Sequence, residues 1–555
     1  MSKLQPKIVS TLKNYSKEQF FSDLTAGIIV AIIALPLSIA LAIASGVTPE
    51  KGLHTAIIAG FLISLLGGSR VQIGGPTGAF MIIVFGIVTE FGIEGLTIAT
   101  ILAGIIMIFM GVMKLGGVIK YIPYPVTTGF TSGIALVIFS SQIKDFFGLP
   151  IENVPIEFLG KWQEYFKAFS EMNLQTTTIG FLALLIIIIW PLISKRIPGA
   201  LIALIVTSII VQIFGLNVAT IGTKFGEISS ELPKLELPIF TIEKIKYLIA
   251  PAFTIAILGS IESLLSAVVS DGMIGGKHRS NMELVAQGVA NMMSGLFGGI
   301  PATGAIARTV ANVKNGGRTP VAGIVHSLTL LLILVIFLPL AKMIPLTSLA
   351  AVLIVVAYNM SEWREFKMLF KSPKSDILVL LITFSITVMI DLVKAIEIGM
   401  VLAAFLFMKR MSEVTNVNIK NLDAAEEDEN EAENNEENLL KIFDKIMIYE
   451  INGPFFFGAA HKFFTALNEL GDKTNVIIIR MRYVPAMDAT ALNAFRIMIE
   501  ICYHKHIEIL ISGINEQPYS ALKKAELVEI IGEDKFFKTI KEAVDYAEQY
   551  FVQSV

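Results

Sequence analysis

The sequence predicts a polytopic α-helical membrane protein that ends in a soluble α/β domain. Its 555 residues are 54% hydrophobic and only 16% charged, which is far more apolar than a soluble globular protein. Stretches poor in charge and long enough to cross a bilayer recur between residues 24 and 408, whereas residues 440–555 have the periodicity of short strands and amphipathic helices. The net charge of −3 gives no indication of nucleic acid as a partner, and the single cysteine, Cys502, excludes an intrachain disulfide.

Fourteen predicted spans fall into two sets of seven, inside a transmembrane domain of residues 21–410 that follows a polar segment of residues 1–20. The first set, in a repeat of about residues 21–215, comprises 24–46, 55–68, 77–91, 95–113, 125–143, 176–193 and 198–214. The second set, in a repeat of about residues 249–410, comprises 251–270, 283–298, 303–313, 320–340, 344–358, 377–390 and 395–408.

The segment after the last span changes in character. We assign residues 411–439 to an acidic linker, because DAAEEDENEAENNEEN at 423–438 has no large apolar side chains with which to build a core. Residues 440–555 then contain three predicted strands, KIMIYEI, NVIIIRMRYV and IEILISGI, separated by amphipathic helices. A small cytoplasmic α/β domain is therefore expected at the C-terminus.

Basic residues give the expected orientation in the membrane. With a cytoplasmic N-terminus, the predicted inner loops contain Arg70, Lys114, Lys120, Lys195, Arg196, Lys277, Arg279, Lys314, Arg318 and the segment 364–374. The short outer loops contain Lys51, Lys342 and Lys394. This positive-inside bias predicts a multi-pass protein of the cell (inner or plasma) membrane with both termini in the cytoplasm.

Two similar motifs interrupt the third span of each set. They read GGPTGAF at 74–80 and GGIPATGAI at 298–306. Within a bilayer, freed backbone groups are tolerated only where they face protein, water or a ligand. We expect Thr77 and Thr303 to start two half-helices whose N-termini bind an anion, as interrupted helices do near the midplane of inverted-repeat transporters. Glycine-mediated helix packing is the structural alternative.

A carboxylate lies deep in the eighth predicted span. Glu262 stands in the apolar segment GSIESLLSAVVSD, and Ser266 follows four residues later on the same helix face. The oxygens of Glu262 and Ser266 could together bind a coupling cation such as Na⁺, or Glu262 alone could carry a proton. The structural alternative is a neutral Glu262 that is hydrogen-bonded to a neighbouring helix. Arg308, one turn into the tenth span, either adds positive potential to the anion site or forms an ion pair with Glu262.

Several motifs resemble, over nearly the whole chain, those of the SulP family of sulfate permeases (solute carrier family 26). They are DLTAGIIVAIIALPLSIALA in the first span, GGPTGAF in the third, IESLLSAVVSDGMIGGKHRSNMELVAQGVANM across the eighth and ninth, and ATGAIARTVANV in the tenth. The C-terminal domain is similar to a STAS domain. The resemblance implies two intertwined seven-span inverted repeats, a core domain that moves against a gate domain in an elevator-like alternating-access cycle, and a homodimer.

The resemblance also implies roles for individual residues. The anion site would lie against ALPLS around Pro36 and comprise Pro76, Thr77, Gly78, Thr303, Gly304 and Ala305. By the same resemblance, Glu262 occupies the position of the residue that couples transport to a cation. In sodium-coupled bicarbonate carriers this position is an Asp, with a Thr four residues later. Because Glu262 and Ser266 stand at these two positions here, we expect coupling to protons rather than to sodium. The amino-acid sequence of spans eight to ten is most similar to that of the bacterial branch of dicarboxylic acid uptake systems. The expected substrates are therefore sulfate-class anions, bicarbonate or four-carbon dicarboxylates.

The STAS-like domain departs from one pattern of its relatives. Regulatory anti-sigma-factor antagonists have a phosphorylatable Ser directly after an Asp at the start of a helix, whereas Ala489 follows Asp488 here. We expect Asp488 to cap the following helix. The domain would regulate transport, dimerise or bind a cytoplasmic protein partner.

Other protein classes fit less well. The sequence has no Cys or His metal-site spacing and no complete Walker loop, so we expect neither an enzyme nor a cofactor other than a coupling H⁺ or Na⁺. A nucleobase permease shares the implied fold, but a second carboxylate would be expected where Thr303 and Gly304 stand. An uncoupled, channel-like anion conductor stays open, as does a sensor whose membrane domain no longer transports.

Overall fold

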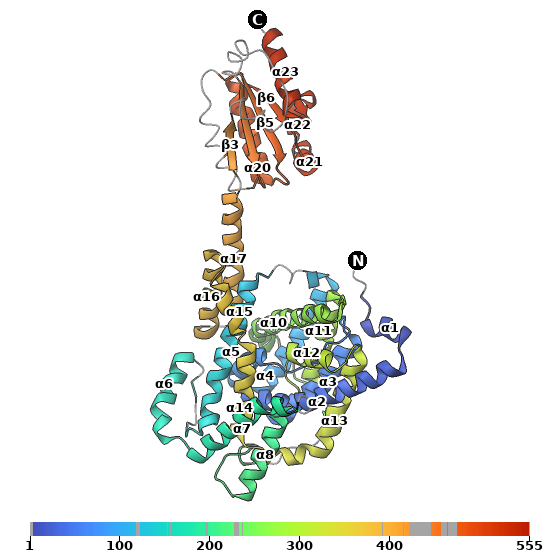
Figure 1. The fold of residues 1–555 in the computed structure, drawn as a ribbon, viewed down its shortest axis with the longest axis vertical. Coiled ribbons are helices and arrows are strands. Elements are labelled where there is room, and N and C mark those ends of the chain that lie inside the picture. Colours follow the sequence, from blue (N-terminus) through green and yellow to red (C-terminus); the bar gives the residue numbers. More distant parts are fainter. Residues whose placement is uncertain are drawn as a thin grey trace. The chain divides into compact units, whose positions relative to one another are not determined.

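A computed structural model describes residues 4–117, 122–151, 154–155, 157–194, 198–226, 232–235, 237–390, 392–414, 416–420, 446–456, 463 and 474–553. The chain divides into two compact units, Met1–Met400 and Val401–Val555 (Figure 1). Among the predicted features, Lys120, Lys195, Arg196 and the acidic run 423–438 lie outside the described residues.

The first unit is helical. Its helices are α1 Lys7–Thr11, α2 Lys17–Ala44, α3 Pro49–Leu66, α4 Gly78–Val112, α5 Tyr124–Phe147, α6 Phe158–Ala168, α7 Leu174–Ile193, α8 Gly199–Ile213, α9 Ile221–Phe225, α10 Ile242–Ile274, α11 Ser280–Leu296, α12 Ile306–Lys314, α13 Pro320–Ala341, α14 Leu346–Met360, α15 Trp363–Leu369 and α16 Lys374–Met389. The helix α17, Leu392–Val414, begins in this unit and ends in the second. Within the described residues, six helices are long and apolar enough to cross a membrane, and two more are apolar but shorter.

Every predicted span overlaps one of these helices, but the division between spans differs at one point. The third and fourth predicted spans both fall in α4, which is interrupted at Gly92 by a backbone φ of 69°. Glycine tolerates this conformation because it has no Cβ. The number of membrane crossings stays a prediction, since several of the overlapping helices are short.

The helices of the first unit form two bundles that draw on both halves of the sequence. One contains α2, α3, α4, α10, α11, α12 and α13, and the other contains α5, α7, α8, α14 and α16. Small residues allow close packing in the first bundle: a Cβ at Gly104 of α4 would lie 2.5 Å from the carbonyl oxygen of Gly288 in α11, and the converse also holds. The two repeats are thus intertwined, as the core and gate domains of the predicted fold require.

The second unit contains a five-stranded sheet of order β3-β4-β5-β6-β7. Its strands are β3 Asn416–Lys420, β4 Ile446–Asn452, β5 Val476–Tyr483, β6 Glu508–Ser512 and β7 Phe536–Phe537, and all neighbouring pairs are parallel except β3 with β4. The helices are α20 Ala489–His504, α21 Glu516–Lys524, α22 Leu527–Ile531 and α23 Ile540–Gln553. The helices α20 and α22 pack on one face of the sheet and α23 on the other.

Two features of this unit differ from the predicted linker and strands. The residues assigned to a linker at 411–439 begin as the end of α17, and residues 416–420 form β3, which pairs with β4. The two-residue strand β7 was not predicted, because it is too short to show a sequence period. Asp488 caps α20 as expected, since its Oδ1 accepts a hydrogen bond of 2.9 Å from the backbone N–H of Ala491.

Candidate functional site

The two interrupted motifs meet as a short antiparallel ladder inside the first bundle. Residues Gly74–Gly75 form β1 and Thr303–Gly304 form β2, with Gly74 opposite Gly304 and Gly75 opposite Thr303. The backbone N–H of Ala305 extends the ladder with a 2.9 Å bond to the carbonyl oxygen of Ile73. The pairing satisfies backbone groups that would otherwise be unpaired in a membrane.

The N-termini of α4 and α12 follow directly after the two strands. Thr77 is the N-cap residue of α4 and Ala305 that of α12, and neither helix has a side-chain capping bond among the described residues. The helix α12 begins at Ile306 rather than at the predicted Thr303, because Thr303 is held extended in β2. Both helices therefore present uncapped N–H groups and the positive ends of their dipoles at the same place.

One face of α10 holds both strands in position. Thr303 Oγ1 donates to the carbonyl oxygen of Gly259 at 2.9 Å, and Gln72 Nε2 donates to that of Ser263 at 2.9 Å. The side chain of Ser266 donates to Thr309 Oγ1 at 3.2 Å, and that oxygen accepts from the N–H of Ile73 at 3.1 Å.

Glu262 lies on this same face, since residues 259, 262, 263 and 266 are three or four positions apart. Its Oε2 accepts a 2.8 Å hydrogen bond from Thr77 Oγ1. The carboxyl of Glu262, a residue of intermediate exposure, thus contacts the N-cap residue of α4, beside the uncapped N–H groups.

Arg308 lies next to the first interrupted motif, residues 74–80. Its side chain is 2% exposed, and Nη2 donates to the carbonyl oxygen of Pro76 at 3.0 Å and to Ser38 Oγ at 3.4 Å. Nη1 has no hydrogen-bond partner among the described residues. None of the described ion pairs joins Arg308 to Glu262, so the guanidinium places an uncompensated positive charge next to the break.

The remaining predicted residues are distributed around this arrangement. Gly78, the first residue of α4, faces the second bundle, because a Cβ there would lie 2.8 Å from Ile138 Cδ1 of α5. Pro36 is buried inside α2, and its neighbour two positions on, Ser38, makes the contact with Arg308. The described residues contain no group of three or more His, Cys, Asp or Glu side chains suited to a metal ion.

A buried carboxylate that the sequence analysis did not single out binds backbone groups shortly before β1. Glu283 of α11 is fully buried, and its Oε2 accepts from the N–H groups of Gly68 and Ser69 at 2.8 and 3.0 Å. Its Oε1 accepts from Gln287 Nε2 at 2.9 Å. Glu283 is the first residue of the predicted span 283–298, so the signal that pointed to Glu262, a carboxylate deep inside an apolar span, was absent there.

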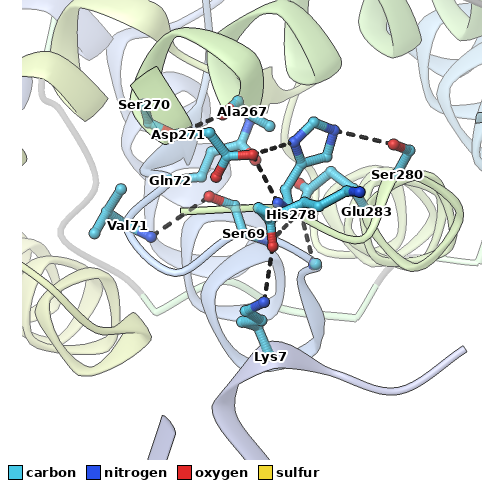
Figure 2. Close-up of polar contacts among 12 residues, drawn as sticks. Lys7, Ser69, Val71, Gln72, Ala267, Ser270, Asp271, His278, Ser280 and Glu283 are labelled. Carbon is cyan, nitrogen blue, oxygen red and sulfur yellow. Dashed lines mark hydrogen bonds and ion pairs between the residues drawn. The ribbon is translucent and has the colours of Figure 1, made fainter. Parts of the chain in front are cut away.

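A second polar cluster fastens the connection between α10 and α11 (Figure 2). Asp271 Oδ2 accepts from the N–H of His278 at 2.7 Å and contacts His278 Nδ1 at 2.7 Å, while Ser280 Oγ lies 3.0 Å from His278 Nε2. Lys7 Nζ donates to the carbonyl oxygen of Lys277 at 2.8 Å. The N-terminal segment is thereby hydrogen-bonded to the connection between α10 and α11.

Comparison with known protein families decides the identity of this architecture. The model of the sulfate permease family matches residues 20–383, and the STAS domain matches residues 439–543. The chain belongs to the sulfate permease family. It is therefore a multi-pass membrane protein of an anion transporter family with a C-terminal STAS domain, and the predicted family and fold class are confirmed.

Individual relatives extend over almost the whole chain. A putative sulfate transporter of Bacillus subtilis, YvdB, is 41% identical over 529 residues, which cover 95% of this chain and 97% of the relative. The bicarbonate transporter BicA of Picosynechococcus is 30% identical over 536 residues, which cover 95% of this chain and 94% of the relative. Both relatives have the name of an anion transporter.

Solved structures share the fold. The transmembrane domain of a cyanobacterial bicarbonate transporter BicA matches with a TM-score of 0.61 at 30% identity, covering 70% of this chain and 98% of that one. The structure of SLC26A9 matches with a TM-score of 0.87 at 18% identity, covering 99% of this chain and 93% of that one. At this level of identity the match shows a shared fold and nothing more.

Gly304 offers a direct test of the ladder. A Cβ at this position would overlap the Gln72 side chain, whereas a Cβ at Gly86 in α4 would meet nothing within 4 Å. We expect Gly304→Ala to displace β2 and to weaken anion binding by about tenfold or more, since overpacking costs on the order of 1–3 kcal/mol. Calorimetric titration of the purified protein measures this, with Gly86→Ala as the matched control; equal affinities in the two variants would contradict the assignment.

Proposed function

We propose that the protein is a secondary active transporter that moves a small anion together with a proton carried by Glu262. The observation that carries the proposal is the 2.8 Å hydrogen bond from Thr77 Oγ1 to Glu262 Oε2. It joins a titratable carboxyl to the N-cap residue of a helix whose first N–H groups have no side-chain cap among the described residues.

The anion is bound by backbone groups in this proposal. The N-termini of α4 and α12 converge at the ladder, and their N–H groups and dipoles favour negative charge without a side chain in direct contact. Arg308 adds a full positive charge from behind Pro76. Because the charge is buried and bonded to a carbonyl oxygen, it raises the local potential while staying fixed in place.

The proton couples to the anion through electrostatic repulsion. An ionised Glu262 beside the N-cap of α4 repels an anion at that helix end, whereas a protonated Glu262 does not. Binding of the proton and binding of the anion therefore favour one another, and the coupling is reciprocal. The loaded carrier has lost the negative charge of Glu262, which lowers the cost of moving the site past apolar surfaces.

The contacts of Ser266 favour a proton over sodium. A sodium site at Glu262 and Ser266 would need the hydroxyl oxygen of Ser266 as a ligand. That hydroxyl is 1% exposed and donates to Thr309 Oγ1, which is itself part of the support of β1. This donation leaves the lone pairs of the Ser266 oxygen available, but a sodium ion bound by them would have to fit beside an almost completely buried side chain, whereas protonation of Glu262 needs no added space.

The substrate class proposed is sulfate, bicarbonate or a four-carbon dicarboxylate. Relatives named as sulfate and bicarbonate transporters support the first two. The second interruption has Thr303 and Gly304 where a carboxylate would repel an anion, which favours anions over nucleobases. The short distance of 2.8 Å between a Cβ built on Gly78 and Ile138 Cδ1 of the second bundle supports an elevator-like movement of core against gate.

Uptake into proteoliposomes tests the proposal. Radiolabelled sulfate, bicarbonate and succinate are each offered with an inward proton gradient, with an inward sodium gradient and with neither. We expect one anion to accumulate when the proton gradient is applied and not when the sodium gradient is. Equal flux under all three conditions would instead indicate an uncoupled, channel-like conductor, and absence of flux for every anion would favour a sensor. Cross-linking in the same membranes tests the expected homodimer.

A further inference from the structure

The helix α6 has an apolar flank that the described residues leave uncovered. It lies at the edge of the first unit beside α5, in the connection between α5 and α7 (Figure 1). Leu159 is 63% exposed and Phe166 is 74% exposed, and Phe169, in the turn directly after the helix, is 42% exposed. Exposed apolar surface next to polar side chains marks a contact site for a protein or a membrane.

The side chains of α6 point in three directions around the helix axis. Tyr165 is 1% exposed and packs in an apolar cluster with side chains of α5. At 3.6 residues per turn, Leu159 and Phe166 point roughly 100–120° away from Tyr165. Glu164 and Lys167 lie farther round and form an ion pair of 2.7 Å. A helix with one side on protein, one apolar side and one charged side fits a boundary between protein, lipid and water.

A hydrogen bond fixes the level of α6 beside the neighbouring span. Trp162 Nε1 donates to Ser140 Oγ of α5 at 3.1 Å. The helix α5 is 24 residues long, or about 36 Å, which exceeds the ~30 Å of hydrocarbon in a bilayer. Ser140 lies about 10 Å before the end of this helix at Phe147. The helix α6 is therefore held beside the last two turns of a span, at the level where hydrocarbon meets the lipid headgroups.

Aromatic rings connect this flank with the exposed surface of the next span. The ring centroid of Phe169 lies 5.1 Å from that of Phe147, which lies 6.4 Å from that of Phe181 in α7. Phe181 and Leu185 are 53% and 55% exposed, and α7 is long and apolar enough to cross a membrane. Aromatic side chains are enriched at membrane interfaces. The apolar flank thus continues a surface whose exposed side chains face lipid.

The size of the flank argues against a second copy of the chain as its cover. A stable dimer buries about 800 Å² on each partner, which takes some 20–30 residues a side. One side of an 11-residue helix supplies much less. A bilayer needs no such area from α6, because the spans on either side of it already hold the chain in the membrane.

We propose that α6 is a membrane-surface anchor whose apolar flank binds phospholipid where the acyl chains meet the headgroups. By the predicted orientation this is the outer surface of the membrane. Leu159 and Phe166 enter the acyl region, the half-buried Trp162 stands at headgroup level, and Glu164 and Lys167 face water.

The attachment of α6 gives the lipid contact a consequence for the second bundle. The helix packs on α5 and α16, which both belong to that bundle. Lipid bound to α6 therefore fixes the level of the second bundle in the bilayer. The use of this anchor in transport rests on the proposed movement of the first bundle against the second, whereas the lipid contact itself does not.

Spin labels at two neighbouring positions test the lipid contact. Cys502 is the single cysteine, so Cys502→Ala provides a background for labels at Phe166→Cys and Lys167→Cys, with Leu185→Cys of α7 as the lipid-facing reference. The full-length protein is placed in vesicles of phosphatidylcholine and phosphatidylglycerol. Collisions of each label are measured with oxygen, which concentrates in hydrocarbon, and with a nickel chelate, which stays in water.

We expect the label at Phe166→Cys to collide mainly with oxygen, as at Leu185→Cys, at a depth of about 5–10 Å below the headgroups. The label at Lys167→Cys should collide mainly with nickel. Equal access of nickel to both positions of α6 would overturn the proposal. So would a label at Phe166→Cys that neither reagent reaches and that shows spin–spin broadening, because a second copy would then cover the flank.

Tryptophan fluorescence gives a measurement that needs no cysteine variant. Lipids brominated near the headgroup end of the acyl chain should quench the wild type more than Trp162→Phe, and the difference reports on Trp162. Equal quenching of the two proteins would contradict the proposed level of α6. Neither measurement involves transport, so failure of the proposed function would leave both outcomes unchanged.

Discussion

Proteoliposomes containing Glu262→Gln are expected to lose proton-driven accumulation of the anion completely. For one proton per anion, each pH unit of gradient supplies about 1.4 kcal/mol and supports about a tenfold concentration ratio. Gln keeps the shape of Glu and still accepts the hydrogen bond from Thr77 Oγ1, but it cannot release a proton. The internal anion concentration should therefore stop at the external one, as measured by uptake at a fixed inward gradient of two pH units.

The same variant should still exchange anion for anion. Because Glu262→Gln resembles the protonated, binding-competent state, counterflow of labelled against unlabelled anion is expected at a rate near that of the wild type. Gly86→Ala, in open space on α4, serves as the control for unrelated damage. Accumulation by Glu262→Gln at the wild-type ratio would show that the proton travels by another route.

Replacement of Arg308 is expected to have the second largest effect. Arg308→Met removes the buried charge and its bond to the carbonyl oxygen of Pro76 while keeping much of the side-chain volume. Hydrogen bonds to charged groups contribute on the order of 1.5–3 kcal/mol, so the anion should bind about 10- to 100-fold more weakly. Equilibrium binding of the labelled anion to purified protein measures this loss.

Arg308→Lys separates charge from packing. Lysine keeps the positive charge but has no second donor at the position of Nη1, so an intermediate affinity is expected if the charge matters. Identical losses in Arg308→Met and Arg308→Lys would indicate that the residue acts through the shape of the break alone. An unchanged affinity in Arg308→Met would remove Arg308 from the account of the site.

The sequence supported prediction of those parts of the site that have local signals. Glycine and proline mark the two breaks, and Glu262 is visible as a carboxylate within an apolar span. The antiparallel pairing of Gly74 with Gly304 had no such signal, since it depends on how two helices some 230 positions apart pack together. For the same reason the start of α12 at Ile306 could not be read from residues 298–306.

The supporting residues were harder to predict than the breaks. Gln72 and Ser38 are ordinary polar residues whose importance comes from the atoms they contact, the carbonyl oxygen of Ser263 and the guanidinium of Arg308. In the STAS domain, the strand alternation that predicted β5 does not reveal that the buried Ser512 Oγ has no hydrogen-bond partner within the described part of the chain. Such properties belong to the tertiary structure.

The central claim, that Glu262 and the paired helix N-termini form one coupled site, is tested most directly by the affinity for the anion as a function of pH. Equilibrium dialysis of purified protein between pH 5 and pH 8 gives this curve for the wild type and for Glu262→Gln. If protonation of Glu262 favours the anion, the wild-type dissociation constant rises with pH, by at most about tenfold per unit, and that of the variant stays constant. A wild-type affinity that does not change with pH, or a pH dependence that persists in Glu262→Gln, would contradict the account.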